Sequence, residues 1–307
     1  RSAAYDHVLI DSVRGVEKQL ISNKTDAETQ DSGNGLISFD TDGFTVKLGT
    51  STSYNNSSQT YAAWNWLAGG TGVTNNDGSI QSTVSVNTEA GFSIVNYTGN
   101  GTGGATVGHG LGVAPDMIIV RNRDVASNFI VYHTANTSAP ETDYLMLNST
   151  AATDDTSSVW NDTAPTSSVF TVGNSSNTNG SSNNMIAYCF AEKKGYSKFG
   201  SYIGNSSADG PFVYTGFRPS FWLQKRTDST SGGNWRIIDI AREPFNDGDP
   251  ARLFPDSNSA EQSNTRNQEL LSNGIKVRSS NVSMNASGGT YIYMAFAEQP
   301  FKYSNAR

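Results

Sequence analysis

Two short apolar stretches decide the fold: MIAYCFAE at residues 185–192 and YIYMAFAE at residues 291–298. Each is rich in aromatic and aliphatic side chains and is preceded by a cluster of Gly, Ser and Asn, which is typical of a β-strand that follows a turn. A weaker copy, YAAWNWLAGG, occupies residues 61–70. Three related stretches in one chain indicate an internal repeat, and a repeat divides the chain into units of the same kind.

Two further elements precede each stretch in the same order. The first is DHVLIDSVRG at 6–15, NFIVYHTA at 128–135 and NWRIIDIARE at 234–243; the second is DGFTV at 42–46, VFTVGN at 169–174 and NGIKV at 273–277. The second and third copies also share a front half, at residues 91–123 and 210–226. The first copy lacks this half. We expect that the sequence is the C-terminal part of a longer polypeptide, the alternative being that a neighbouring chain supplies the missing strands.

The length of the apolar pieces predicts the fold class. Most are four to eight residues long, which is too short for helices but sufficient for the strands of a sandwich. A complete unit spans about 100 residues, the size of one two-sheet sandwich. The sequence therefore predicts an all-β chain of tandem β-sandwich repeats, with helical turns only at residues 13–22 and near residues 267–271. The expected division is an incomplete first sandwich at 1–70, a linker or exposed loop at 71–88, a second sandwich at 89–200 and a third at 201–307.

Composition excludes several classes of protein. Of the 307 residues, 36% are hydrophobic and 16% charged. The 14 Phe, 13 Tyr and 5 Trp supply an apolar load that disordered chains lack. No apolar run approaches the roughly 18 residues of a membrane-spanning helix, so membrane insertion is not expected. The net charge of -7, without any Lys/Arg cluster, argues against nucleic acid as a partner.

Few residues are candidates for catalysis. His133 stands where the other two copies carry Asp11 and Asp239, so this position is interpreted as structural. Asp11 with Arg14 and Asp239 with Arg242 share one spacing, and an active site is rarely duplicated together with its scaffold. We interpret each pair as a structural contact within its unit. No catalytic, cofactor-binding or metal-binding residue is predicted, and the protein is not expected to be an enzyme.

Two acidic loops and one cysteine have simpler explanations than a site. DTDG at 40–43 and NDGD at 246–249 alternate carboxylates as calcium loops do, but neither continues to a bidentate Glu. Asp, Asn and Gly form turns in their own right, so turns are expected at both places. Cys189 lies within an apolar run and is expected to be a small buried side chain.

The C-terminal third carries a resemblance to a known family. YSKFGSYIGNSSADGPFVYTGFRPSFWLQKR at 196–226, NWRIIDIAREPFN at 234–246 and YIYMAFAEQPFKYSNAR at 291–307 resemble a repeat domain of bacteriophage virion structural proteins. These are mostly tail fibres or tail-associated proteins. The resemblance implies a β-sandwich of laminin-G-like, concanavalin-like or jelly-roll type, a virion location, and assembly as a homo-oligomer with other virion proteins. It implies no catalytic residue.

Our leading hypothesis is a non-enzymatic structural and adhesion protein of a phage appendage, such as a tail fibre. Its polar loops would contact the host surface, through glycans, in the extracellular space. Four tryptophans on expected strands could stack on sugars, but core packing is the expected use of most of them: Trp64, Trp66, Trp222 and Trp235. Trp64 and Trp66 are two apart and therefore share a face, so both would be exposed to a ligand if that face is the outer one. The other candidate ligand-contact residues are the polar loop residues Asn55, Asn179, Asn246 and Asp247.

Two alternatives stay open. One is the polysaccharide depolymerase of a tailspike, whose carboxylates would meet between subunits. The other is a cellular extracellular fibre or adhesin that carries N-linked glycans. The candidate glycosylation sites are Asn23, Asn55, Asn56, Asn96, Asn100, Asn136, Asn148, Asn161, Asn174, Asn179, Asn205, Asn281 and Asn285.

Overall fold

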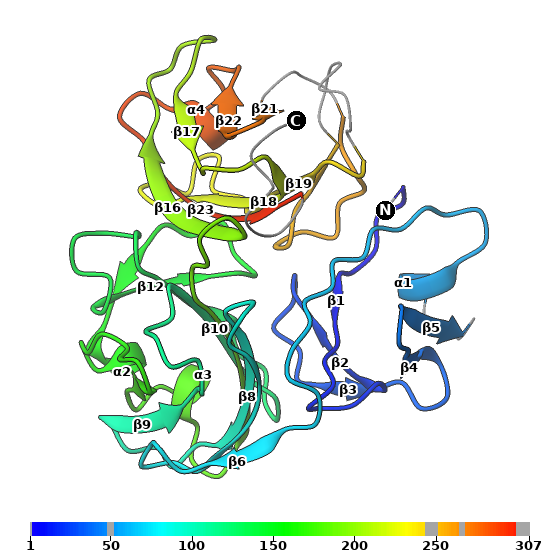
Figure 1. Cartoon of the computed structure of the whole chain (residues 1–307), viewed down its shortest axis with the longest axis vertical. Helices are drawn as coiled ribbons and strands as arrows, with labels where there is room; N and C mark the ends of the chain where they lie inside the picture. Colours follow the sequence, from blue (N-terminus) through cyan, green and yellow to red (C-terminus); the bar gives the residue numbers. More distant parts are fainter. Residues whose placement is uncertain (1, 48–51, 243–250, 264–267, 299–307) are drawn as a thin grey trace.

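The protein is built almost entirely of β-strands, as predicted. The structure, a computed structural model, describes residues 2–47, 52–242, 251–263 and 268–298 (Figure 1). Its helices are single turns of four residues: α1 (Thr52–Asn55), α2 (Ser157–Trp160), α3 (Ser176–Asn179) and α4 (Val282–Asn285). Short strands dominate because apolar residues alternate or cluster over a few positions and turn-forming residues follow. The strands form several packed sheets around buried apolar clusters, so the chain is an all-β sandwich protein.

Residues 71–195, called unit 2, form the largest sandwich. Its main sheet has the order β13-β12-β11-β10-β15-β8-β7-β6. The strands of this sheet are β6 (Val73–Asn75), β7 (Ser82–Asn87), β8 (Phe92–Thr98), β10 (Met117–Asn122), β11 (Ile130–His133), β12 (Asp143–Met146), β13 (Asp154–Asp155) and β15 (Asn184–Phe190). The second layer pairs β9 (Ala105–Gly108) with β14 (Val169–Val172). Val95, Ala187 and Phe170 are part of the buried cluster of this unit.

Residues 196–298, called unit 3, form a second sandwich. The main sheet has the order β16-β23-β18-β19-β20, and the other sheet has the order β17-β22-β21. The strands are β16 (Ser197–Ile203), β17 (Phe212–Tyr214), β18 (Pro219–Arg226), β19 (Arg236–Asp239), β20 (Arg252–Leu253), β21 (Gln268–Leu271), β22 (Gly274–Val277) and β23 (Thr290–Ala297). Its core contains Trp222, Ile275 and Tyr293.

Units 2 and 3 share one arrangement of strands. The order β11-β10-β15-β8 in unit 2 corresponds to β19-β18-β23-β16 in unit 3, and the pair β9 and β14 corresponds to β17 and β22. Side-chain contacts correspond as well. The Tyr97 hydroxyl donates to the Thr178 carbonyl at 2.5 Å, and the Tyr202 hydroxyl donates to the Met284 carbonyl at 2.9 Å. Positions in the two units can therefore be compared residue by residue.

Residues 2–70, called unit 1, contain only part of this arrangement. One sheet joins β1 (Val8–Leu9), β2 (Lys18–Ile21) and β3 (Thr29–Gln30), and a hairpin joins β4 (Gly35–Phe39) to β5 (Phe44–Lys47). Residues 61–68 correspond to β15 and β23 but are in no strand. In units 2 and 3 the corresponding strand pairs on both sides, with β8 and β10 or with β16 and β18. Within the described residues, unit 1 has no strands that correspond to those neighbours.

Three expectations from the sequence are wrong in detail. Residues 71–88, expected as a linker, contain β6 and β7, which extend the main sheet of unit 2 beyond β8. The expected boundary between residues 200 and 201 cuts through β16, which pairs along its length with β23. Residues 13–22 and 267–271 were expected to contain helical turns but contain β2 and β21. In each case pairing with another strand decided the local structure.

The three units meet in a common core. Trp66, Phe190 and Phe296 contact one another edge to face or nearly so, with ring centroids 6.1, 5.6 and 6.3 Å apart. Each of these rings follows a corresponding Asn of its unit by eleven residues: Asn55, Asn179 and Asn285. One corresponding ring from each unit thus contributes to the same cluster. Figure 1 shows the three units as neighbouring groups of strands.

Candidate functional site

The two tryptophans proposed for sugar stacking face the common core instead. Trp64 and Trp66 are partly buried and pack against the central cluster. The Trp64 indole donates to Asp239 Oδ2 at 3.2 Å, and Trp66 lies edge to face on Phe221 with centroids 5.4 Å apart. The opposite side of this segment is the exposed one, with Leu67 at 79% exposure. The prediction that the tryptophans contact a ligand is therefore wrong, because the face they share is covered by units 2 and 3.

Asn179 is a structural residue. Its side chain is fully buried, its Oδ1 accepts from the backbone N–H of Asn100 at 2.8 Å, and its Nδ2 donates to the carbonyls of Thr102 and Gly173 at 2.9 Å. The role predicted for Asn179 in ligand contact is therefore wrong.

Asn285 holds the corresponding loops of unit 3 in the same way. It accepts from Asn205 N–H at 2.7 Å and donates to the carbonyls of Ser207 and Ser279 at 2.7 and 2.8 Å. A buried amide that joins two loops in each complete unit explains why this Asn recurs. Asn55, the third of the set, is exposed, while Asn246 and Asp247 lie outside the described residues.

The candidate glycosylation sites divide by exposure. Three side chains are buried and cannot carry a glycan in the folded protein: Asn136, Asn179 and Asn285. Four are partly buried: Asn23, Asn56, Asn96 and Asn148. Six are exposed: Asn55, Asn100, Asn161, Asn174, Asn205 and Asn281. The buried group is therefore wrong as a set of glycosylation sites.

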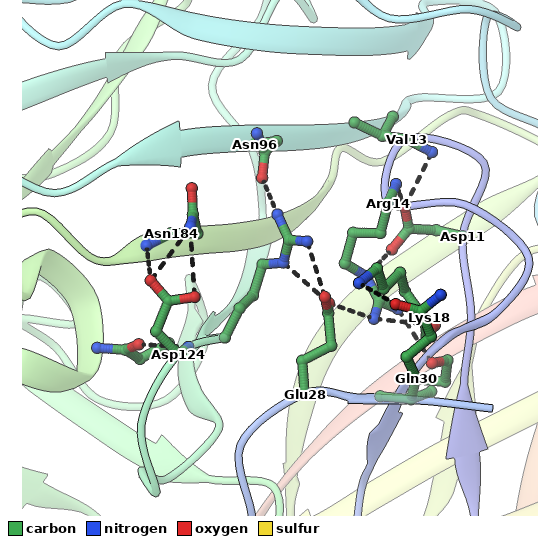
Figure 2. Close-up of polar contacts among 12 residues, drawn as sticks. Asp11, Val13, Arg14, Lys18, Glu28, Gln30, Asn96, Asp124 and Asn184 are labelled. Atoms are coloured by element: carbon green, nitrogen blue, oxygen red, sulfur yellow. Dashed lines mark hydrogen bonds and ion pairs between the residues drawn. The ribbon is translucent and has the colours of Figure 1, made fainter. Parts of the chain in front are cut away.

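A polar cluster lies where unit 1 meets unit 2, and we name it corner A (Asp11, Arg14, Glu28 and Tyr188). Arg14 Nε is 2.5 Å from Asp11 Oδ2, and Arg14 Nη1 is 3.1 Å from Glu28 Oε2. Dashed lines mark these contacts in Figure 2. The Tyr188 hydroxyl of unit 2 donates to Asp11 Oδ2 at 2.7 Å and accepts from Arg14 Nη2 at 3.0 Å. The Asp–Arg pair predicted from the sequence is confirmed, and it also joins two units.

Contacts within corner A determine which of its groups are charged. Burial by itself raises the pKa of Asp11, but the Arg14 guanidinium and the hydrogen bonds from Arg14 and Tyr188 outweigh burial and lower it. Burial raises the pKa of Tyr188 far above its usual value. Asp11 is therefore ionised and Tyr188 neutral at pH 7, so this carboxyl has no proton to donate as a general acid. The arrangement serves to hold the two units together.

A second ion pair extends corner A along the same boundary. Arg123 of unit 2 binds Glu28 with two nitrogens, Nε at 2.9 Å and Nη2 at 2.8 Å, and its third nitrogen donates to Asn96 at 2.7 Å. The Glu28 N–H also donates to the Arg123 carbonyl at 2.8 Å. This forked geometry fixes orientation as well as distance.

Corner C (Asp239, Arg242, Glu261 and Trp64) is the corresponding cluster between units 3 and 1. Arg242 Nε is 2.6 Å from Asp239 Oδ2, and Arg242 Nη1 is 2.5 Å from Glu261 Oε2. The guanidinium carbon lies 5.6 Å from the centre of the Trp64 ring, within cation–π range. Trp64 occupies in unit 1 the position that Tyr188 occupies in unit 2.

Corner B (His133, Asn136, Thr153 and Tyr293), between units 2 and 3, is neutral. His133 Nδ1 accepts from the Ala135 N–H at 3.1 Å, so its Nε2 carries the proton and donates to the Tyr293 carbonyl at 3.1 Å. The Thr153 hydroxyl donates to Asn136 at 2.8 Å. Burial lowers the pKa of His133 to about 4, so the ring is neutral at pH 7.

Sequence patterns did not predict the third member of each charged corner, Glu28 or Glu261, or the contacts between units. A signal was present, because Glu28 follows Asn23 by five residues and Glu261 follows Asp256 by the same distance. Other expectations hold. DTDG at 40–43 closes the β4–β5 hairpin with a bond of 2.9 Å from Asp40 N–H to the Gly43 carbonyl, and Cys189 is fully buried. NDGD at 246–249 lies outside the described residues.

Comparison with known proteins places the chain in a family. A family model described as a domain of unknown function (DUF7483) matches residues 1–300. The chain belongs to this family. No curated protein and no solved structure matches the chain. Within the described part of the chain, no cluster of three or more His, Cys, Asp or Glu could hold a metal ion, and no helix is long and apolar enough to cross a membrane.

Proposed function

We propose that this member of DUF7483 is a structural and adhesion component of a bacteriophage appendage, such as a tail fibre, that binds host-surface glycans through rigid loops. The resemblance of residues 196–226, 234–246 and 291–307 to phage virion repeats supports the location. The common core and the three corners join the units into one stiff body, which suits a load-bearing appendage.

The observation that carries the adhesion role is a pair of polar loops in each complete unit. In unit 2, buried Asn179 ties the turn at 99–102 to the loop that starts at Gly173, and Asn100 and Asn174 on these loops are exposed. Unit 3 repeats the arrangement with Asn205 and Ser279 around Asn285. Exposed amides and hydroxyls held by a buried anchor offer neutral hydrogen-bonding groups to sugar hydroxyls at little cost in loop entropy.

A glycan array tests this role. The purified chain is applied to a panel of bacterial lipopolysaccharides and capsular polysaccharides, beside a variant that combines Asn100→Ala, Asn174→Ala and Asn205→Ala. We expect saturable binding to a subset of the glycans and at least a tenfold loss in the variant. The matched control is Asn65→Ala, which alters an exposed Asn of unit 1, outside the anchored loops of units 2 and 3. Binding that is absent from the whole panel, or equal in variant and parent, contradicts the adhesion role.

Three further measurements test the proposal against its alternatives. Release of reducing ends from any bound polysaccharide would mean a depolymerase rather than a non-enzymatic adhesin. Intact mass of the protein from its native source distinguishes an N-glycosylated cellular fibre, because each glycan adds mass at an exposed sequon. Antibody labelling of virions locates the chain directly, and label confined to a tail or capsid appendage is the expected result.

A further inference from the structure

Unit 1 exposes apolar positions that are buried in the other two units. In the second layer, Phe44 of β5 is 37% exposed, whereas the corresponding Phe170 of β14 and Ile275 of β22 are 1% and 0% exposed. Phe39, beside Phe44 in the same hairpin, is 46% exposed. In units 2 and 3 this layer also pairs with β9 or β17, and unit 1 has no such strand among its described residues.

The segment of unit 1 that corresponds to β15 and β23 is exposed as well. Leu67 is 79% exposed, while the corresponding Ala191 and Ala297 are 2% and 7% exposed. Tyr61 is 37% exposed, and its counterparts in β15 and β23 are fully buried. In unit 1, the β4–β5 hairpin and residues 61–67 both expose apolar side chains, whereas the corresponding positions of units 2 and 3 are buried in a core. This difference indicates that unit 1 lacks the layer of strands that would cover both surfaces.

Two polar features of unit 1 are open in the same way. Asn55 corresponds to Asn179 and Asn285, which bind the turns GNGT at 99–102 and GNSS at 204–207, yet Asn55 is exposed. β1 pairs with β2 alone among the described strands, whereas β11 and β19 pair on their other side with β10 and β18. An open edge and an exposed turn-binding amide are the features that an added strand requires.

We propose that unit 1 is a docking surface for a polypeptide segment of the front-half type, with one strand, a Gly-Asn-x-Ser/Thr turn and two further strands. The chain itself shows the occupant twice, because β8 to β10 and β16 to β18 cover the corresponding surface in units 2 and 3. In the docked segment, the first and third strands lie on either side of residues 61–68. Its second strand pairs with β5, and the Asn of its turn binds Asn55. This inference is independent of the proposed function, since it rests only on the surface of unit 1.

A chimera tests the docking surface. Asn234 of unit 3 corresponds to Asp6 of unit 1. The Asn234 side chain binds Asp256, and the Asp6 side chain binds Asn23 in the same way. A second copy of residues 197–233 is therefore placed directly ahead of Asp6, in place of residues 1–5. Leu67→Cys then supplies an exposed thiol in a chain whose native Cys189 is buried. We expect the thiol to react at least tenfold more slowly in the chimera than in the parent chain.

Substitution of Asn55, the residue expected to bind the turn of the docked segment, supplies the matched control. Asn55→Ala should leave the Tm of the parent chain unchanged within about 1 °C, because Asn55 is exposed there, and lower that of the chimera by about 4 °C. Asn179→Ala should lower the Tm of both proteins. Equal thiol reactivity in parent and chimera, or an equal effect of Asn55→Ala in both, overturns the proposal.

A synthetic peptide of residues 197–226, added to the full parent chain, keeps the test decisive if the chimera does not fold. The expected result is protection of the Leu67→Cys thiol at one peptide per chain, and weaker protection by the same peptide with Asn205→Ala. No protection by the peptide overturns the proposal. Protection of the thiol in the parent chain alone, rising with its concentration, would mean that a second copy covers this surface and would also overturn it.

Discussion

Corner A and corner B occupy corresponding positions of neighbouring units but are built from different chemistry. Corner A holds an ionised Asp11, Arg14 and Glu28 against the Tyr188 hydroxyl. Corner B holds the neutral His133 ring against a backbone carbonyl, with Asn136 and Thr153 where corner A has Arg14 and Glu28. Both corners are buried, and both join two units of the same chain.

The difference shows what the position requires. A buried ion pair costs desolvation that its own attraction offsets only when every partner is present, whereas neutral hydrogen-bonded groups cost less to bury. Because both solutions occur in one protein, the position requires satisfied hydrogen bonds across the boundary and does not require charge. The charged corner should therefore be the more sensitive to loss of a single partner, and the neutral corner the more sensitive to pH.

Removal of the central cation of corner A is expected to have the largest effect. Arg14→Ala leaves the Asp11 carboxylate buried beside Glu28 without a counter-ion, and should lower the free energy of unfolding by about 3–5 kcal/mol. Urea denaturation measures the loss. The control is Arg278→Ala, whose side chain is 42% exposed and whose loss should stay within about 0.5 kcal/mol. Equal losses in the two variants would mean that corner A contributes no more than a surface pair.

The pH dependence of stability separates corner B from the rest. The pKa of His133 is about 4 in the folded protein, below the unfolded value near 6.5, so the unfolded chain takes up the proton first as pH falls. The stability that neutral His133 contributes is therefore present above pH 6.5 and is lost as pH falls toward 4. Between pH 7 and pH 5 the loss should be about 2 kcal/mol.

The matched comparison for this effect is His133→Asn. Burial raises the pKa of Asp256 to about 6, so its contribution runs in the opposite sense: it is present at low pH and is lost as pH rises from 3.8 toward 6. Asp256 is common to parent and variant, so the difference between their two pH profiles reports His133 alone. Parallel profiles for parent and variant between pH 7 and pH 5 would show that His133 is not buried in neutral form.

The smallest effect is expected from conversion of one corner into the other. The triple variant Asp11→His, Arg14→Asn and Glu28→Thr replaces the ions of corner A by the residues of corner B. Arg123→Thr is added, because Arg123 would otherwise lose its partner Glu28 and Thr227 occupies the corresponding position of unit 3. The combined variant should cost about 1 kcal/mol by urea denaturation, less than Arg14→Ala alone, because no buried charge is left unpaired. A loss larger than that of the single variant would mean that the charges themselves are required at this boundary.

Local pattern was sufficient for much of the fold. The stretches at 185–192 and 291–298 cover all but the first residue of β15 and β23. The two Asp–Arg pairs form within their units, and Trp222 and Trp235 are buried as expected. All of these depend on contacts along the chain or on apolar character, which a sequence displays directly. Residues 71–88 were misread because their Gly and Asn residues indicate a loop, while pairing with β8 makes them strands.

The candidate site was harder to predict. Alternation places Trp64 and Trp66 on one face, but no local rule states which face a neighbouring unit covers. Asn179 belongs to a polar loop by composition, and only the return of the chain at Asn100 makes it an anchor.

The sequence by itself determined the fold class, most strand positions and the contacts within each unit, because these depend on residues close together in the chain or on a repeated pattern. The tertiary structure alone decided how the units meet. The contacts between units join residues that lie 160 to 175 positions apart in the sequence: Arg14 with Tyr188, Trp64 with Asp239, and His133 with Tyr293. Such contacts depend on how the sheets of the three units pack around a common core, and no local pattern or repeat in the chain predicts that packing.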